Sequence, residues 1–324
     1  MGRELGPWRP READRRHHPG MVARPSPLPE SLKGRAFGIQ EAHHAGLSPS
    51  RVRGRDLDRP FAGVRVAPGE DEPAPQHPVV TLARIYALKM GPAEFFSHST
   101  AAVIYGMWLP LDLEQSTLLH VSVRKPARAP RDRGVKGHHL VDRPGLVVEH
   151  DGVRLASPLE TWCQLATQLH IPDLVAAGDS LLTPDHRETA VMLDRLVGAA
   201  ADGDRPMSIR LERAVRLIRR NVRSAKESEL RLLLLAAGLP EPEINGTIVD
   251  EQGRFVAECD LVYRGANVVL EYEGDGHRDR ARFRKDITRY DRLQDLGWRV
   301  IRVTQEDLNH PADLLARVRR ALGL

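Results

Sequence analysis

The sequence has only two cysteines among its 324 residues, Cys163 and Cys259, and they lie far apart. This scarcity argues against a disulfide framework and against a cysteine-based zinc site, and it is typical of a reducing compartment. Long apolar runs are also lacking. The longest, LLLLAAGL at 232–239, falls well short of the roughly 18 residues that a membrane span needs. The first twenty residues lack the apolar core of a secretory signal. We therefore expect a cytoplasmic protein without a membrane partner.

An excess of either charge is nearly absent as well. Lysine and arginine total 48 against 44 acidic residues, a net charge of +4, which favours a polyanionic partner only weakly. The length is sufficient for two or three domains. We expect a disordered tail over 1–30, then domains over 31–78, 79–200 and 206–324. Alternating helix and strand patterns predict an α/β chain, α+β overall.

The segment 31–78 has the pattern of a small winged helix-turn-helix. Gly46 ends one predicted helix, Ser48 can cap the next, and Pro49 suits its first position. The second helix of such a module enters a DNA major groove. Three basic residues mark this helix as a candidate DNA reader: Arg51, Arg53 and Arg55. A helical hairpin with solvated arginines is the alternative.

The middle domain is expected to mix strands and helices. Asp151-Gly152 predicts a hairpin turn between two strands. The segment 124–139 is interpreted as a basic Pro/Gly loop that contacts phosphates or is simply solvated. His138 and His139 at its end are adjacent in sequence, which is poor spacing for a metal pair.

The C-terminal domain is predicted in the order helix, strand, strand, helix, strand, helix. The stretch LEYEGDGH at 270–277 places two carboxylates after an apolar strand. Buried acids are costly unless something neutralises them. Glu227 on the preceding helix, Asp260 on the paired strand and Glu271 can converge, and such oxygen ligands suit Mg²⁺ or Mn²⁺.

Each acid also has a purely structural interpretation. Ser224 and Glu227 fit a helix capping box. Asp260 can be a polar residue on the open face of an edge strand. Glu271 and Glu273 alternate with apolar residues, as in any half-exposed strand. The acids carry weight only as a set.

The C-terminal region, about 220–324, resembles a known family. Its motifs are S-x-x-E at Ser224–Glu227, an aspartate at Asp260, then EYEGDGH at 271–277, and GWRV at 297–300. They resemble the endonuclease-like domain of unknown function 559, which is related to very short patch repair endonucleases in the PD-(D/E)XK superfamily. The region 36–185 resembles, more loosely, AbiEi-type antitoxin proteins, on TAAVIYGMWLP and SPLETWCQLA.

The resemblance implies a restriction-endonuclease-like mixed sheet flanked by helices, with Glu227, Asp260 and Glu271 as metal ligands. The superfamily usually has lysine two residues after the second acid, whereas this chain has Glu273. His277 falls on the family's histidine and is a candidate general acid or base. Glu273 is a candidate metal ligand or proton acceptor. Basic residues of the predicted helix 279–296 are expected to grip the DNA backbone, among them Arg282, Lys285 and Arg289.

We therefore predict a metal-dependent DNA endonuclease that uses Mg²⁺ or Mn²⁺, hydrolyses phosphodiesters and is linked to defence or toxin–antitoxin biology. Its expected partner is DNA, with a cognate toxin or another protein as a further partner and no small-molecule cofactor. The first alternative is a non-enzymatic DNA-binding regulator of antitoxin type with a degenerate nuclease fold. The second is a protein–protein adaptor.

Overall fold

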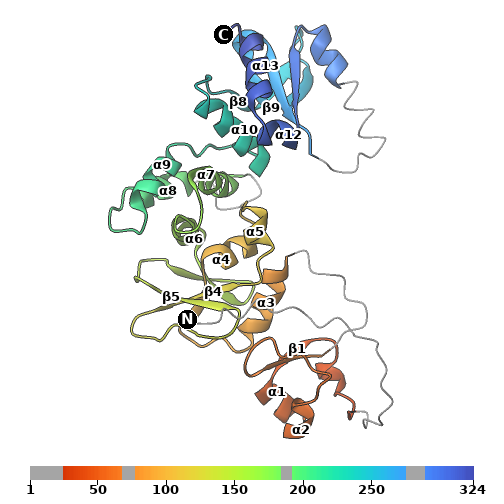
Figure 1. Ribbon diagram of the computed structural model, residues 1–324, viewed down its shortest axis with the longest axis vertical. Helices are drawn as coiled ribbons and strands as arrows, with labels where there is room; N and C mark the ends of the chain where they lie inside the picture. Colours follow the sequence, from red (N-terminus) through yellow and green to blue (C-terminus); the bar gives the residue numbers. More distant parts are fainter. Residues whose placement is uncertain (1–24, 68–76, 184–191, 275–288) are drawn as a thin grey trace. The chain divides into compact units, whose positions relative to one another are not determined.

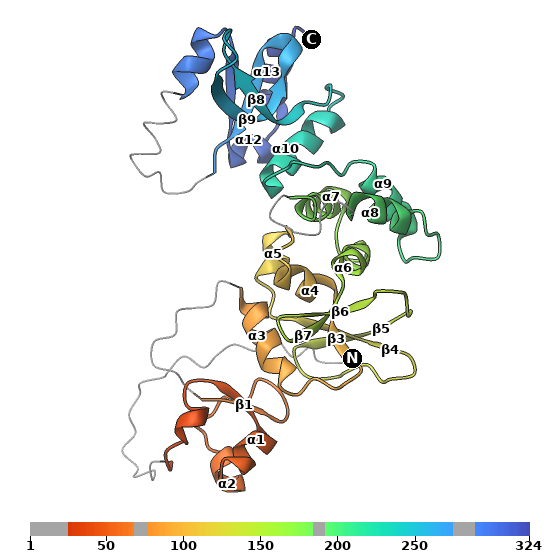
Figure 2. The same ribbon diagram turned by 180° about the vertical axis from the view of Figure 1, so that it is seen from behind.

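The computed structural model describes residues 25–67, 77–183, 192–274 and 289–324. The chain divides into two compact units, Met1–Leu165 and Ala166–Leu324. Helices and mixed or antiparallel sheets alternate within the described residues, so the α+β fold class predicted from the sequence is confirmed (Figures 1 and 2). None of the described helices is long and apolar enough to cross a membrane.

The first unit begins with a small helical module closed by a two-stranded sheet. Its elements are η1 (Glu30–Leu32), β1 (Ala36–Gly38), α1 (Ile39–His44), α2 (Pro49–Val52) and β2 (Val64–Val66). Ser48 caps α2 by accepting the backbone N–H of Arg51, and Pro49 opens that helix, as predicted. Phe37 lies in β1 and is fully buried.

The rest of the first unit is a five-stranded sheet in the order β5-β4-β3-β7-β6. Its strands are β3 (Glu94–Phe96), β4 (Leu119–Arg124), β5 (Val135–Leu140), β6 (Val147–His150) and β7 (Val153–Ala156). Its helices are α3 (Pro78–Ala87), α4 (His98–Ile104), α5 (Leu111–Glu114) and α6 (Pro158–Leu165). Asp151 and Gly152 make the predicted turn, both with positive φ.

One boundary in this sheet was predicted wrongly. The segment 124–139 was interpreted as a loop, but residues 135–140 form β5, which pairs in parallel with β4. The loop signal of Gly134 and Gly137 hid the strand. Gly137 is needed because an added Cβ would lie 2.3 Å from the backbone oxygen of Pro130.

The second unit starts with helices that the sequence analysis had grouped with the middle domain. They are α7 (Ile171–Ser180) and α8 (Met192–Ala200), followed by α9 (Ser208–Val215). A fully buried ion pair ties α7 to α10 (Ala225–Ala236): Arg231 Nη2 lies 3.0 Å from Asp179 Oδ2. Ser228 Oγ donates to the same oxygen at 2.7 Å. This internal polar contact explains why α7 belongs with the C-terminal domain.

The C-terminal domain has a four-stranded sheet in the order β11-β10-β9-β8. The strands are β8 (Glu243–Val249), β9 (Phe255–Tyr263), β10 (Val268–Tyr272) and β11 (Arg299–Val303). Neighbours are antiparallel except β10 and β11, which run parallel. The helices α12 (Gln305–Asn309) and α13 (Ala312–Leu322) complete the domain. β8 and α12 were not predicted, so the observed order is helix, three strands, helix, strand and two helices.

The two faces of this sheet carry separate cores. One face packs against α10, α12 and α13 (Figure 1) through a cluster that includes Leu230, Leu270 and Val318. The other face buries Cys259 and Val269 beneath Leu293, which lies in helical residues 289–295. The rest of the predicted helix 279–296 lies outside the described residues. Because both faces are covered, acids on β9 and β10 enter a low-dielectric environment.

Candidate functional site

Asp260 and Glu271 lie where β9 and β10 stop pairing. The ladder of paired residues ends at Leu270 opposite Leu261, and the next positions are Glu271 and Asp260. There the Asp260 carboxylate replaces the ladder, because its Oδ2 accepts the backbone N–H of Tyr272 at 2.8 Å. Glu271 is only 5% exposed, and Asp260 is partly buried. The prediction that these two acids face each other across the strand pair agrees with this register.

Glu271 forms an ion pair with Arg289, which lies 18 residues later in the sequence. Arg289 Nη1 and Nη2 lie 3.2 and 3.3 Å from the two carboxylate oxygens of Glu271. Nη1 of the same guanidinium also donates to the backbone oxygen of Glu258 at 3.2 Å. The fork geometry of arginine suits this bidentate contact. Arg289, predicted to grip DNA, therefore holds the acid cluster in the described structure.

Glu273 has its own partner. Its carboxylate pairs with Arg302 Nε, and Arg302 lies on β11 rather than on the helix after β10. In the parallel register Arg302 is opposite Glu271, so it reaches Glu273 diagonally. Glu273 is thus compensated by an arginine on the neighbouring strand.

Glu227 is 6% exposed and closes the start of α10. Its Oε2 accepts the backbone N–H of Arg223 at 2.9 Å and the side-chain amide of Asn245 at 2.7 Å. Ser224 Oγ donates to Oε1 at 3.0 Å and accepts the N–H of Glu227. Ser224 is therefore the N-cap that the capping interpretation predicts, but the Glu227 carboxylate accepts the backbone N–H of Arg223 rather than that of Ser224.

The pKa of Asp260 reflects the charges of both other acids. Burial, followed by the charge of Glu271 and then of Glu227, raises the pKa of Asp260 to about 7, against a partial opposing effect of the Tyr272 N–H and Arg289. Like charges that converge in this way favour either protonation or a bound cation. Carboxylate oxygens are the donors that Mg²⁺ and Mn²⁺ prefer.

The N-terminal arginines divide into two groups. Arg51 is buried: its Nη2 lies 2.7 Å from Asp56 Oδ2, and its Nε donates to the backbone oxygen of Ser26. The prediction that Arg51 reads DNA is therefore corrected, because its side chain is used to hold the module together. Arg53 and Arg55 are exposed and remain available to a nucleic acid. His277, Arg282 and Lys285 lie outside the described residues.

A second cluster was missed by the sequence analysis. Within the described residues, the group of three possible ligand side chains whose donor atoms all lie within 4.8 Å of one another is His98, His120 and His138. The three acids do not form such a group. The histidines are 22 and 18 positions apart and match no metal motif. The available signal was His120 inside the apolar strand pattern LLHVSV, where a polar side chain needs a partner.

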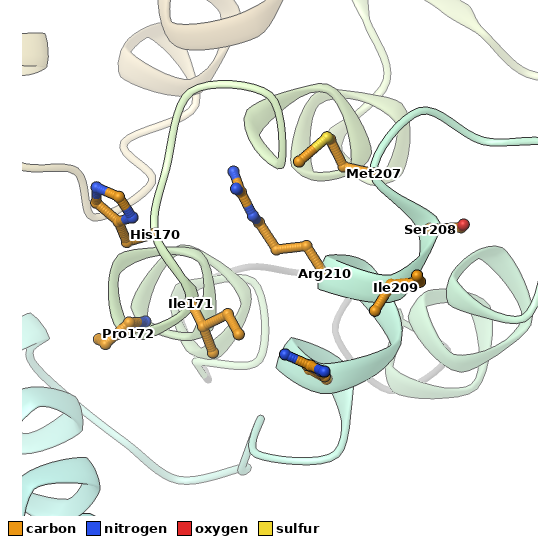
Figure 3. A pocket seen from close by; sticks show the side chains of 8 residues that line it. His170, Ile171, Pro172, Met207, Ser208, Ile209 and Arg210 are labelled. Atoms are coloured by element: carbon orange, nitrogen blue, oxygen red, sulfur yellow. The ribbon is translucent and has the colours of Figure 1, made fainter.

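A pocket in the second unit shares no lining residue with the acid cluster or the histidine cluster. Figure 3 shows its wall, formed by the start of α7 and the start of α9, with His170, Ile171 and Arg210 among the labelled side chains. Arg210 Nη1 donates to the backbone oxygens of Ala166 and Leu169 at 2.7 and 2.9 Å. This guanidinium is therefore part of the scaffold, and none of the described residues that line the pocket has a carboxylate.

Comparisons with known proteins assign no activity. No family model matches the chain. It is similar to the uncharacterized proteins MT2308 and Rv2248 of Mycobacterium tuberculosis, from strains CDC 1551 / Oshkosh and ATCC 25618 / H37Rv. Each is 29% identical over 248 residues, which cover 74% of this chain and 86% of the relative. A crystal structure of the RV2827C protein of Mycobacterium tuberculosis aligns with a TM-score of 0.36 and 14% identity, over 67% of this chain and 84% of that one.

Proposed function

We propose that this protein is a metal-dependent DNA endonuclease whose site is formed by Glu227, Asp260 and Glu271. The observation that carries the proposal is that Asp260 and Glu271 lie at adjacent positions of β9 and β10, and that the charges of Glu271 and Glu227 both raise the pKa of Asp260. Each acid also has a structural contact: Glu227 at the helix start, Glu271 with Arg289, and Asp260 with the N–H of Tyr272. These contacts do not explain why the partly buried Asp260 carboxylate stands in the field of two other acids.

The three carboxylates offer the type of ligand atom that a hard divalent cation prefers, but their oxygens lie too far apart to bind one ion without rearrangement. All three side chains offer oxygen atoms, as Mg²⁺ and Mn²⁺ require. The three carboxylates are more widely spaced than the histidine group, and the Arg289 guanidinium bridges both oxygens of Glu271. Binding of an ion by Asp260 and Glu271 therefore requires Arg289 to give up at least one of these contacts. A bound ion would supply charge stabilisation at phosphorus.

The chain's own residues have separable roles in this proposal. Asp260 and Glu271 hold the ion, and Glu227 orients them from the helix terminus. Arg289, once released from Glu271, presents a guanidinium to a DNA phosphate, for which its planar fork is well suited. The Glu273 carboxylate is paired with Arg302, so this proposal gives it no part in proton transfer. Proton transfer is then left to His277, the family's histidine.

The test is a nicking assay on supercoiled plasmid DNA. We expect nicked product with Mg²⁺ or Mn²⁺ and none with EDTA. Asp260→Asn should abolish nicking, because it removes a ligand without changing shape. The matched control is Asp250→Asn, an acid of the same sheet region whose carboxylate pairs with Arg254 in an exposed turn.

The outcome of this assay decides the proposal. Equal nicking by wild type and Asp260→Asn means that a contaminant or another site cuts the DNA. An absence of nicking on plasmid, linear duplex, mismatched duplex and single-stranded DNA with either ion overturns the enzyme assignment. Circular dichroism of each variant establishes that loss of activity is not loss of fold.

A second candidate function, a DNA-binding regulator without cleavage, is favoured by one observation. Two of the four acids near β10 already have arginine partners, Glu271 with Arg289 and Glu273 with Arg302. Such internal neutralisation is what a nuclease fold that has lost its ion would need. Fluorescence anisotropy with labelled duplex DNA tests it: the same affinity in Mg²⁺ and in EDTA, with intact DNA recovered, supports the regulator. Affinity that depends on the divalent ion contradicts it.

A further inference from the structure

The first unit contains a histidine cluster that is unrelated to the acids. His98 is the first residue of α4, His120 is the second residue of β4, and His138 lies on β5. Because β4 and β5 are parallel, with His120 opposite Lys136 and Ser122 opposite His138, the two strand histidines are diagonal neighbours. The elements that carry them, α4, β4 and β5, all belong to the same unit (Figures 1 and 2).

The imidazole rings are in close contact. Nε2 of His138 lies 3.0 Å from Nδ1 of His120. The ring centroids of His98 and His138 are 4.0 Å apart and stacked, and those of His98 and His120 are 5.4 Å apart. Nitrogen ligands around one ion lie about 3–3.5 Å from each other when each is about 2.1 Å from the metal. Small ring rotations therefore suffice to place three nitrogens around a common centre.

Hydrogen bonds from neighbouring residues hold the rings in place, as they do for the histidine ligands of metal sites. Nδ1 of His98 lies 3.0 Å from Ser97 Oγ, and Ser97 Oγ lies 2.6 Å from Ser122 Oγ. His98 itself has φ of +52°, a conformation that a non-glycine residue seldom adopts. Its backbone N–H donates to Gln164 Oε1 at 2.9 Å, so a buried amide keeps it there. Backbone strain maintained by its surroundings is often found at functional sites.

The protonation state also suits metal binding. Burial lowers the pKa of His98 to about 2, that of His120 to about 3 and that of His138 to about 4. All three rings are therefore neutral at physiological pH, so no imidazolium charge opposes a cation. Lys136, which is exposed on β5, contributes to each of these shifts and is the charge that opposes a cation.

From this geometry we infer that His98, His120 and His138 form a binding site for a divalent transition metal of the Zn²⁺ class. Three imidazole nitrogens select Zn²⁺, Co²⁺ or Ni²⁺ over Mg²⁺, which prefers oxygen. With three protein ligands the ion keeps an open coordination position. His138 is the partly exposed member of the group, whereas His98 and His120 are buried.

The experiment uses the untagged full-length protein, stripped with a chelator and dialysed, so that no purification tag binds the metal. Titration with ZnCl₂ is followed by calorimetry, and metal content after gel filtration is measured by mass spectrometry. We expect one Zn²⁺ per chain for wild type. His138→Ala should weaken Zn²⁺ binding by about 100-fold or more, because it removes one of the three ligands. Since His138 is partly exposed, the substitution should have little effect on the packing of the core.

The matched control is His139→Ala. His139 is the next residue of β5, is exposed, and its Nε2 lies 3.1 Å from the backbone oxygen of Ala127 rather than near the other histidines. The variant His139→Ala should bind Zn²⁺ with the affinity of wild type. Wild type that retains no Zn²⁺, or loss of binding in His139→Ala equal to that in His138→Ala, overturns the site. In the first case the three histidines are only a packed, hydrogen-bonded group of neutral rings.

His138→Cys keeps the proposal testable if His138→Ala is poorly folded. With Co²⁺ as the probe, wild type should show the weak visible bands of a nitrogen-coordinated ion. His138→Cys should add the near-ultraviolet charge-transfer band of a cobalt–thiolate bond. A Co²⁺ spectrum identical to wild type places the ion elsewhere and overturns the assignment of His138.

Discussion

The histidine cluster of the first unit and the acid cluster of the second both bury three titratable side chains. The two clusters avoid the cost of burying charge in different ways. In the first unit burial leaves the rings uncharged, so neutral imidazoles can contact one another directly. In the second unit Glu271 keeps an arginine partner, Glu227 accepts N–H donors at the start of α10, and Asp260 has its pKa raised instead. Histidine loses its charge at small cost, whereas a carboxylate near neutral pH must be paired, protonated or metal-bound.

The difference sets what each cluster can bind. Neutral nitrogens that already lie within 4.8 Å of one another need only an ion. The acids need both an ion and the withdrawal of Arg289. The first cluster should therefore bind metal more readily than the second, and with the opposite preference between Zn²⁺ and Mg²⁺.

The largest expected effect separates the two units by stability. Arg231→Met leaves the carboxylate of Asp179 buried without its cation, and breaking a buried pair in this way costs about 3–5 kcal/mol. Hydrogen exchange read by mass spectrometry should show faster exchange in α7 and α10. Zn²⁺ binding by the first unit should be unchanged. Faster exchange in β4 and β5, or loss of Zn²⁺, would show that the two units do not fold independently.

The next effect concerns the metal itself. Free Zn²⁺ at 100 times its dissociation constant should stabilise the first unit by about 2.7 kcal/mol, if it binds only the folded state. The same concentration of Mg²⁺ should have no effect on this unit. The measurement is the melting temperature of each protein with and without Zn²⁺. Zn²⁺ should raise the melting temperature of wild type but not that of His138→Ala. An equal response of that variant would mean that Zn²⁺ acts at another place.

A smaller effect is expected in the acid cluster. The folded pKa of Asp260 lies near 7 and the unfolded value near 3.8, so the folded state binds more protons between these values and stability falls as pH rises through this window. Asp260→Asn removes this loss. It should therefore be more stable than wild type at pH 8 by on the order of 2 kcal/mol, with little difference near pH 4.

The same variant tests the comparison of the two clusters through metal. Mg²⁺ or Mn²⁺ should raise the melting temperature of wild type at pH 8 and leave Asp260→Asn unchanged, while both proteins keep their response to Zn²⁺. A variant that is no more stable than wild type at pH 8 would show that Arg289 already neutralises the cluster.

The sequence predicted the local features well because each has a local cause. The turn at Asp151-Gly152, the cap at Ser48 and the start of α10 after Ser224 depend on residues within a few positions of one another. Strand β8 was missed because EINGTIV has Asn245-Gly246 in its middle, which is a turn signal. Asn245 has positive φ and donates to Glu227, so tertiary contacts explain this strand.

The candidate site shows the same limit. The pairing of Asp260 with Glu271 followed from a hairpin and was predictable. The arginines that compensate the acids were not, because Arg289 is 18 residues from Glu271 and Arg302 is 29 residues from Glu273. The histidine cluster depends on the parallel pairing of β4 with β5, within a segment that was interpreted as a loop.

The smallest effect is expected at Glu273, the glutamate in the lysine position. Glu273→Gln removes the charge that faces Arg302, whose side chain is half-exposed, so the loss should be about 0.5–1 kcal/mol. Glu243→Gln is the matched control, because Glu243 pairs with Arg264 at another position on the same sheet. If both variants lower the melting temperature slightly and nick plasmid DNA as wild type does, Glu273 has an ion-pair role. Should Glu273→Gln alone reduce nicking, with its stability equal to that of Glu243→Gln, its carboxylate acts on the ion or the substrate. Arg302 would then be the residue that positions it.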